Sequence, residues 1–302
     1  YRHSGGDKKL DVNIDTRMIA LFGKPLGFSF AARMQNAAYK AMGLNMLYFY
    51  GEVGSDHLEE VLDSVRYLNF YGCAVTKPNK VEVLKYLDEL DGLCEKMGSS
   101  NTVVKLPDGR LRGYNTDGIG FILSLNEETS IDIEQSVFFS MGAGGVGRAI
   151  CSAAAYYGAK QIFIADKYPE SALALVADIN EKFRPVAEFV DYANEKELRE
   201  KLAEADVVMN NTGIGMIPNV NSTPLPKEYL LPRQLCFDAT YNPEKTRFLI
   251  EAEEAGCSTL SGLGMSVYQG AAQIKLWTGH EAPVEVMKQE VRAILAEQHA
   301  KS

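Results

Sequence analysis

The sequence predicts an α/β protein with two domains, and three observations support this prediction. Short apolar runs alternate with helical patterns along most of the chain, which is typical of βαβ units and parallel sheets. One of these runs leads directly into a glycine-rich turn and then an alanine-rich helical pattern. The chain has 302 residues, which is enough for two domains with separate cores.

The expected strands are short apolar runs, and the expected helices carry apolar residues at three- and four-residue spacing. We expect strands at residues 18–22, 47–52, 73–75, 137–141, 162–165, 207–210 and 237–239. We expect helices at residues 33–42, 58–67, 170–183 and 245–255. The segment 101–113 differs, because Pro107-Asp108-Gly109 joins two short β-like runs and predicts a hairpin.

The domain boundary is expected in the polar stretch 126–130, which separates an apolar helical run from the strand before the glycine-rich turn. After Gly262 the chain is helical (265–277 and 284–298) with no new strand, so these helices need another surface to pack on. We expect a discontinuous N-terminal α/β substrate domain at residues 16–126 and 262–302, with a Rossmann-type domain at 127–261 inserted in it.

Composition excludes several classes of partner. The net charge of -9 and the pI near 5.1 argue against nucleic acid. No apolar stretch approaches the roughly 20 residues that cross a bilayer, and no signal segment opens the chain, so we expect a cytoplasmic protein without a membrane partner. The five cysteines are odd in number and widely spaced, so we expect buried thiols and neither disulfides nor a metal site. Residues 1–15 are expected to form a loose end.

The glycine-rich turn fits a dinucleotide site. It consists of Gly142, Ala143, Gly144, Gly145, Val146 and Gly147, between an expected strand and an expected helix. In this G-x-G-x-x-G pattern the first glycine permits a tight turn, the second admits a pyrophosphate, and the third lets the helix pack on the strand. The helix N-terminus adds N–H donors and a positive dipole.

Asp166 ends the next expected strand, close to the roughly 20-residue offset at which an acidic side chain meets the adenosine ribose. A carboxylate there accepts hydrogen bonds from ribose hydroxyls and repels a 2′-phosphate, so we expect NAD to be favoured over NADP. Lys167 leaves NADP open, because its ammonium group could meet a 2′-phosphate from the side.

Hydride transfer from an alcohol needs a group that takes the hydroxyl proton. The four histidines lie outside motif-like turns, and we interpret them as surface or packing residues: His3, His57, His280 and His299. Better candidates are Lys80 and Asp117, each in a turn with a motif-like sequence. A surface salt bridge is the alternative interpretation of this pair.

Five separated segments, at 75–80, 98–102, 113–118, 142–147 and 262–269, resemble in this order the shikimate dehydrogenase family, including its quinate/shikimate branch. The resemblance runs from about residue 19 to residue 279. It implies transfer of a hydride between a nicotinamide dinucleotide and a ring hydroxyl or ketone of shikimate or 3-dehydroshikimate. Motifs in the right order are far more specific than any one of them.

The resemblance also implies roles for individual residues. Lys80 and Asp117 would form the catalytic pair and share a proton as a coupled unit, because lysine is an ammonium ion near neutral pH. The small ring acid would be bound by Ser29, Thr76, Asn101, Tyr241 and Gln269. Beyond the glycine turn, the dinucleotide would contact Asp166, Lys167, Thr212, Gly213, Gly262 and Met265.

The chain departs from the family in the loop that binds the substrate carboxylate. The family pattern is similar to H-S-x-S-P-x-x-H-N, whereas residues 28–36 read Phe-Ser-Phe-Ala-Ala-Arg-Met-Gln-Asn. Ala31 therefore lacks a hydroxyl whose hydrogen bond to a charged group is worth roughly 1.5 to 3 kcal/mol. Either the carboxylate is held otherwise, for which Arg33 is a candidate beside its interpretation as a helix-surface residue, or another acid is the better substrate.

Further departures leave alternatives open. Ala74 stands where many members have Asn, and Gly213 stands where many have Ser. Asp166-Lys167 replaces an Asn-Arg pair of members that use NADP, and this replacement favours NAD. The alternatives to a shikimate enzyme are a dehydrogenase for quinate or another hydroxylated ring carboxylate, and a dinucleotide sensor without turnover. We expect a monomer or a homodimer.

Overall fold

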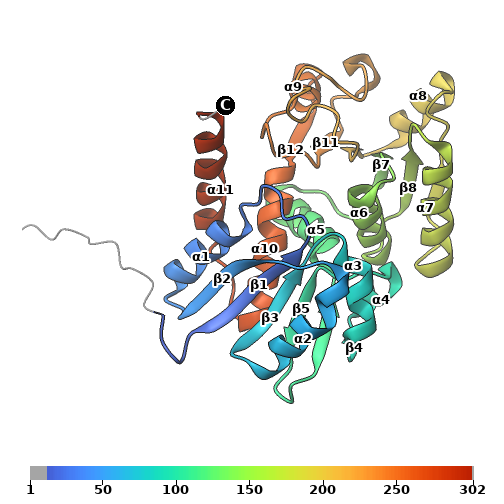
Figure 1. Cartoon of the computed structure of the whole chain (residues 1–302). Coiled ribbons are helices and arrows are strands. Elements are labelled where there is room, and N and C mark those ends of the chain that lie inside the picture. The colour runs from blue at the N-terminus through green and yellow to red at the C-terminus, as the bar shows by residue number, and fades with distance from the viewer. Residues whose placement is uncertain (1–11, 301–302) are drawn as a thin grey trace, which may run out of the picture.

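The computed structural model describes residues 12–300, and its strands form two sheets (Figure 1). The first sheet has the order β2-β1-β3-β5-β6-β4. Its strands are β1 (Arg17–Gly23), β2 (Met46–Glu52), β3 (Phe70–Val75), β4 (Glu89–Leu90), β5 (Thr102–Lys105) and β6 (Leu111–Tyr114). β1 is parallel to β2 and β3, whereas β5 is antiparallel to β3 and β6, so the predicted hairpin is confirmed.

The second sheet is parallel throughout, with the order β12-β11-β10-β7-β8-β9. Its strands are β7 (Val137–Met141), β8 (Gln161–Ala165), β9 (Ala187–Phe189), β10 (Val207–Asn210), β11 (Leu235–Asp238) and β12 (Ser258–Ser261). This is the strand order of dinucleotide-binding doubly wound folds, in which ligands bind where the order reverses, here between β7 and β10. The predicted α/β class is confirmed.

The helices connect and cover these sheets. The α-helices are α1 (Ala31–Met42), α2 (Leu58–Tyr67), α3 (Asn79–Glu82), α4 (Gly92–Met97), α5 (Thr116–Glu128), α6 (Gly145–Tyr156), α7 (Pro169–Lys182), α8 (Glu195–Glu204), α9 (Arg247–Glu254), α10 (Gly262–Thr278) and α11 (Val284–His299). The 3₁₀ helices are η1 (Ser55–His57), η2 (Val83–Tyr86) and η3 (Lys227–Tyr229). The predicted helices correspond to α1, α2, α7 and α9. α5 continues to Glu128, past the expected start of the polar boundary stretch.

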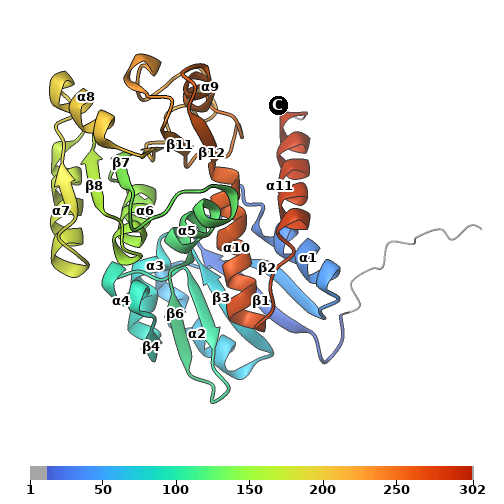
Figure 2. The ribbon, with the colours of Figure 1, turned by 180° about the vertical axis from the view of Figure 1, so that it is seen from behind.

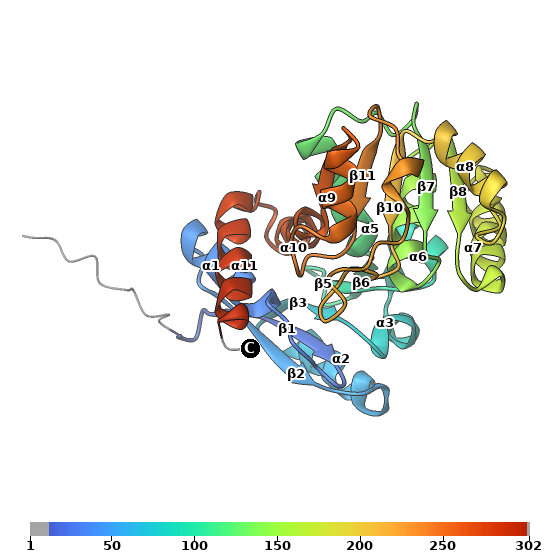
Figure 3. The same ribbon diagram turned by 90° about the horizontal axis from the view of Figure 1, so that it is seen from above.

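α10 links the two sheets. It begins directly after β12 and runs along α5 toward the first sheet, where α11 packs against α1 (Figures 1 and 2). Ile274 and Trp277 of α10 share one buried core with Ile19 of β1 and Tyr48 of β2. Seen from above, α10 lies between the part of the molecule with α1 and α11 and the part with the second sheet (Figure 3). The C-terminal helices thus complete the core of the first sheet.

All five cysteines are buried and free, as predicted. Within residues 12–300, no helix has both the length and the apolar character that crossing a bilayer requires. In the same range, no group of three or more His, Cys, Asp or Glu side chains is placed to hold a metal ion. Most of the expected loose end, residues 1–11, lies outside the described part of the chain.

Candidate active site

Two turns bring Lys80 and Asp117 together. Lys80 lies in α3, which follows β3, and Asp117 lies in the first turn of α5, where the Asn115 side chain accepts a hydrogen bond from the Asp117 backbone N–H at 3.2 Å. Lys80 Nζ donates to Asp117 Oδ2 at 2.6 Å. The two side chains are 30% and 18% exposed, so the pair remains accessible to a ligand. The structure therefore joins the two residues that the sequence singled out.

The second oxygen of Asp117 is held by two amides. Asn101 Nδ2 donates to Asp117 Oδ1 at 2.8 Å, and Gln269 Nε2 of α10 donates to the same oxygen at 2.7 Å. Because these two amides and Lys80 come from three separate parts of the chain, the carboxylate is fixed in one orientation. Two of the predicted substrate residues thus lie directly beside the predicted catalytic pair.

A close helix contact lets Gln269 reach this carboxylate. A Cβ atom added to Gly120 of α5 would lie 2.4 Å from the Met265 carbonyl oxygen and 2.8 Å from the Gln269 backbone nitrogen. Only a residue without a side chain allows α5 and α10 to approach so closely. The Met265 side chain, predicted to contact the dinucleotide, is only 7% exposed and packs in a core cluster.

Thr76 directly follows the end of β3, beside Asn101. The backbone N–H of Val75 donates to the Asn101 carbonyl oxygen at 2.8 Å, which aligns the two strand ends. Thr76 is partly buried. The structure therefore brings Asn101 and Gln269 to the Lys80–Asp117 pair, whereas Thr76 lies at the adjoining strand end and its role stays a prediction.

The loop that carries Ser29 is held by Tyr50, a residue that the sequence analysis missed. Tyr50 OH donates to the Ser29 carbonyl oxygen at 2.8 Å and accepts from the Ala32 N–H at 3.0 Å. Ser29 Oγ accepts from the Ala31 N–H at 3.2 Å. Tyr50 therefore places a phenol hydroxyl next to the position where Ala31 lacks one. An exposed tyrosine at a strand end gives no distinct sequence signal.

Tyr241 lies against the same loop, because the Phe30 ring stands edge-on to it with the centroids 5.2 Å apart. Burial raises the pKa of Tyr241 above its ordinary value of 10.0, so its hydroxyl is neutral near pH 7 and able to donate a hydrogen bond.

Arg33, the other candidate for the substrate carboxylate, pairs with Glu290 and Glu297 of α11. Its interpretation as a helix-surface arginine is therefore confirmed.

The glycine turn has the geometry of a phosphate cradle. Gly142 has a φ of 100°, and its N–H donates to the Ala165 carbonyl oxygen at 2.8 Å. A Cβ on Gly147 would lie 2.0 Å from the Gly142 oxygen, so the helix packs closely on the turn. Gly144 and Gly145 face open space, and no side chain caps α6 there. The first N–H groups of α6 therefore remain available to a pyrophosphate.

Asp166 ties the end of β8 to this turn. Its Oδ2 accepts from the Ala143 N–H at 2.7 Å, and its Oδ1 accepts from the Tyr168 N–H at 2.9 Å. The Lys167 ammonium lies 5.8 Å from the centroid of the Tyr168 ring. Thr212 borders the turn, because its backbone nitrogen would lie 3.0 Å from a Cβ on Gly142. Asp166 and Thr212 thus both border the glycine turn.

Two of the histidines and the glycines Gly213 and Gly262, which the sequence analysis also considered, lie outside the Lys80–Asp117 cluster. His57 is exposed in η1 between Asp56 and Glu60, and His280 is exposed after α10, so neither joins the cluster. His3 falls outside the described residues. Gly213 has a φ of 77° in the loop after β10. Gly262 opens α10, and its N–H donates to the Thr240 carbonyl oxygen at 3.3 Å.

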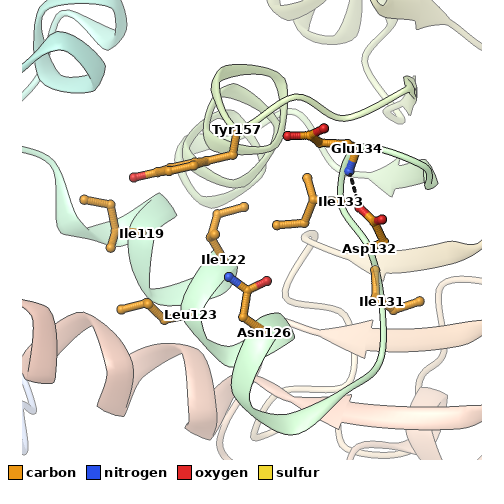
Figure 4. Close-up of a pocket in the computed structure, with 9 residues that line it drawn as sticks. All are labelled: Ile119, Ile122, Leu123, Asn126, Ile131, Asp132, Ile133, Glu134 and Tyr157. Atoms are coloured by element: carbon orange, nitrogen blue, oxygen red, sulfur yellow. Dashed lines mark hydrogen bonds between the residues drawn. The ribbon is translucent and has the colours of Figure 1, made fainter.

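A hollow of about 350 Å³ lies away from these residues, between α5, the end of α6 and the segment before β7 (Figure 4). It is lined by Ile119, Ile122, Leu123, Asn126, Ile131, Asp132, Ile133, Glu134 and Tyr157. Asn126, Asp132, Glu134 and Tyr157 are its polar residues, and Asp132 already accepts a hydrogen bond from the Glu134 N–H at 3.0 Å. The hollow contains none of the predicted site residues, so we do not assign it to the reaction.

Two family models match the chain. One describes the shikimate dehydrogenase substrate binding domain and matches residues 21–103. The other describes the shikimate 5'-dehydrogenase C-terminal domain and matches residues 262–292. The protein named shikimate dehydrogenase (NADP(+)) from Moorella thermoacetica is 39% identical over 283 residues, which are 94% of this chain and 95% of that protein. The chain belongs to the shikimate dehydrogenase family.

Other members show the range of the family. The quinate/shikimate dehydrogenase of Escherichia coli is 37% identical, over 93% of this chain and 98% of its own. The structure of Listeria monocytogenes shikimate 5-dehydrogenase in complex with shikimate and NAD has a TM-score of 0.88 at 38% identity, covering 93% of this chain and 98% of that one. Membership makes this chain an NAD(P)-dependent oxidoreductase with a substrate domain and a Rossmann-type domain.

A further structural relative is the 5-ketofructose reductase of a Gluconobacter species, in its ligand-free form. It has a TM-score of 0.85 at 30% identity and covers 92% of this chain and 99% of its own. The name of this relative refers to a substrate that is not a ring acid. The same fold therefore also occurs in a protein that is named after a different substrate.

Proposed function

We propose that the chain catalyses the reversible oxidation of a ring hydroxyl of shikimate to a ketone, with NAD preferred over NADP. The single observation that supports this most is the contact between Lys80 and Asp117, with Asn101 and Gln269 on the other carboxylate oxygen. A plain surface salt bridge would not gather two further amides that bind Asp117. The same cluster argues against a dinucleotide sensor without turnover.

When bound, the dinucleotide takes or supplies the hydride at its nicotinamide ring. In the oxidation, Lys80 in its amine form accepts the proton of the substrate hydroxyl, and Asp117 stabilises the ammonium ion that results. In the reduction, the Lys80 ammonium returns the proton to the ketone oxygen. Asn101 and Gln269 keep Asp117 oriented throughout.

Within this proposal, five residues orient the ring: Ser29, Thr76, Asn101, Tyr241 and Gln269. The hydroxyl of Tyr50 lies next to Ala31, where the family pattern has a second serine, and its bonds to the Ser29 carbonyl and the Ala32 N–H hold the loop that carries Ser29. We further propose that residues 16–126 and 262–302 form the substrate domain and residues 127–261 the dinucleotide domain. The substitution at Ala31 keeps quinate, or another hydroxylated ring carboxylate, as the second candidate substrate.

The preference for NAD rests on Asp166. Its carboxylate lies at the end of β8, anchored to the turn through Ala143, where it would repel a 2′-phosphate. The Moorella and Listeria relatives carry NADP(+) in their names, and the Listeria structure contains NAD, so the preference for NAD is argued from Asp166 and not from these relatives. Lys167 is held near the Tyr168 ring, which reduces its availability to a phosphate.

A substrate panel tests the proposal. The purified protein is mixed with shikimate, quinate or a neutral polyhydroxylated ring alcohol, each with NAD and with NADP, and the reduced dinucleotide is followed by absorbance. We expect the highest kcat/KM with shikimate and NAD. Turnover of quinate alone would move the assignment to the second candidate. Binding of a dinucleotide without turnover of any alcohol would refute the proposed function.

A further inference from the structure

A chain of buried polar side chains leads from Asp117 into the interior between α10 and α1. Its members are Asn101, Thr102, Thr116, Gln273 and Gln35. Each is at most 6% exposed, at positions where apolar side chains would pack without needing partners. Such a buried polar chain is favourable only when its hydrogen bonds are made in a definite pattern.

The orientation of Asn101 is fixed by a group that can only donate. The backbone N–H of Thr116 points to Asn101 Oδ1 at 2.8 Å, so this atom of the amide must be the oxygen. Asn101 Nδ2 therefore faces Asp117 Oδ1, at 2.8 Å. The hydroxyl of Thr102 lies 2.9 Å from the same Asn101 oxygen.

The far end of this series of hydrogen-bonded side chains is Gln35, and its orientation is fixed by a carbonyl oxygen, which can only accept. Gln35 Nε2 lies 3.1 Å from the Gly270 carbonyl oxygen, so this atom must be the nitrogen. It also donates to Gln273 Oε1 at 3.3 Å, which turns Gln273 Nε2 toward Thr102 Oγ1 at 2.9 Å. Because Thr102 Oγ1 accepts this bond, its own hydrogen is directed to Asn101 Oδ1, either directly or through Thr116 Oγ1, which lies 3.1 Å from both atoms.

The hydrogen bonds from Gln35 through Gln273, Thr102 and Asn101 are consequently all donated in the direction of Asp117. We propose that Gln273 is a positioning residue for the reaction, which acts through Thr102 and Asn101 to hold Asp117 as an oriented carboxylate. Hydrogen bonds aligned head to tail polarise one another, so the Asn101 N–H becomes a stronger donor to Asp117. Loss of Gln273 removes the donor to Thr102 Oγ1, so the bonds from Thr102 to Asn101 and from Asn101 to Asp117 are polarised less and weaken. The inference rests on the proposed role of Asp117.

The groups around Asp117 make this effect measurable. Lys80 of α3 is the charged group paired with it, whereas α10 and the turn before β5 present the amides Gln269 and Asn101. The nearby thiol of Cys94, which contacts the Ser99 carbonyl, stays neutral because burial raises its pKa to about 12. The hydrogen bonds from Gln273 through Thr102 connect α10 to Asn101.

The test replaces Gln273 by methionine, which keeps the length of the side chain but removes both polar groups. The titration of the Asp117 carboxyl carbon is followed by NMR, with Asp117→Asn used to assign the resonance. We expect its midpoint to move to higher pH in Gln273→Met. We also expect kcat at neutral pH to fall roughly three- to tenfold, the effect of one lost hydrogen bond, with KM for the dinucleotide unchanged.

Gln234→Met is the matched control, because Gln234 is equally buried and its Nε2 donates to the Leu202 and Ala205 carbonyl oxygens, far from Asp117. We expect it to lower thermal stability without moving the Asp117 midpoint. Thr102→Val is the second test variant if Gln273→Met does not fold. An unchanged midpoint in the folded variant, or an equal shift in Gln234→Met, would overturn the inference. The NMR readout needs no turnover, so failure of the proposed function is detected separately by the substrate panel.

Discussion

Gln269 Nε2 donates to Asp117 Oδ1 at 2.7 Å, although 152 residues separate the two in the sequence. Asp117 opens α5 and Gln269 lies on α10, so the contact depends on the packing of these two helices. The orientation of the proposed catalytic carboxylate is therefore set by the C-terminal part of the chain.

Lys80→Ala is expected to lower kcat by about 100-fold or more, because the variant loses the amine that is paired with Asp117 and exchanges the proton. Binding of the dinucleotide, followed by its fluorescence, should change little. Lys85→Ala is the control, since Lys85 pairs with Glu82 on the surface and should be dispensable. Near-normal turnover of Lys80→Ala would remove this residue from the mechanism.

Asp166→Ala is expected to weaken the binding of NAD more than that of NADP, because the variant loses both a ribose acceptor and a charge that repels a 2′-phosphate. Asp166→Asn separates the two effects. Its amide oxygen can still accept from the Ala143 N–H, while its charge is gone, so binding of NADP should improve. Titration calorimetry with each dinucleotide gives the answer. Equal losses for both dinucleotides in both variants would leave Asp166 with a structural role only.

Gly120→Ala is expected to destabilise the protein by about 1 to 3 kcal/mol, because the added Cβ forces α5 away from the Met265 carbonyl and from Gln269. An alanine in an exposed helix usually stabilises it by comparison with glycine. Gly145→Ala is the matched helical control, since its Cβ would meet nothing within 4 Å. Urea unfolding without dinucleotide measures both variants. A Gly120→Ala protein as stable as the wild type would contradict the close contact.

Asp238 at the end of β11 predicts a pH dependence of stability. Burial raises the pKa of its carboxyl above the ordinary value of 3.8, against hydrogen bonds from Thr246, the Thr240 N–H and Asn210. The folded state therefore binds this proton more tightly than the unfolded state. The contribution of Asp238 to stability is fully present below the unfolded pKa and is lost as the pH rises through the folded pKa.

The measurement compares wild type with Asp238→Asn, which does not titrate at this position. We expect the wild type to exceed the variant in free energy of unfolding by more at about pH 4 than at about pH 7. Denaturation curves at several pH values supply the difference. A difference that grows with rising pH would show that the hydrogen bonds to Asp238 outweigh the effect of its burial.

The features that the sequence predicted correctly have strong local patterns. The glycine turn requires residues without side chains at Gly142 and Gly147, and α1, α2, α7 and α9 have regular apolar spacing. α8 was missed because Leu198 and Leu202 are its only buried residues among many charges. β12 was missed because its sequence Ser-Thr-Leu-Ser carries one buried residue.

A family resemblance predicted that Lys80 and Asp117 form a pair. It did not predict the hydrogen bonds by which other residues hold the site in place. The contacts of Tyr50 with Ser29 and Ala32 depend on how β2 lies beside β1. Gln273 and Thr102 meet only because α10 packs behind β5. Hydrogen bonds between residues so distant in sequence leave no local pattern, since a buried glutamine and an exposed one look alike in the chain.

The route of α10 has a consequence for synthesis on the ribosome, where the N-terminal part of a chain emerges first. The second sheet is built from one continuous stretch and can fold while translation continues. The first sheet exposes Ile19 and Ala74 until Val267 and Trp277 of α10 have been made. We therefore expect the earliest-made half of this protein to mature last, and nascent chains that stop before α10 to be clients of chaperones.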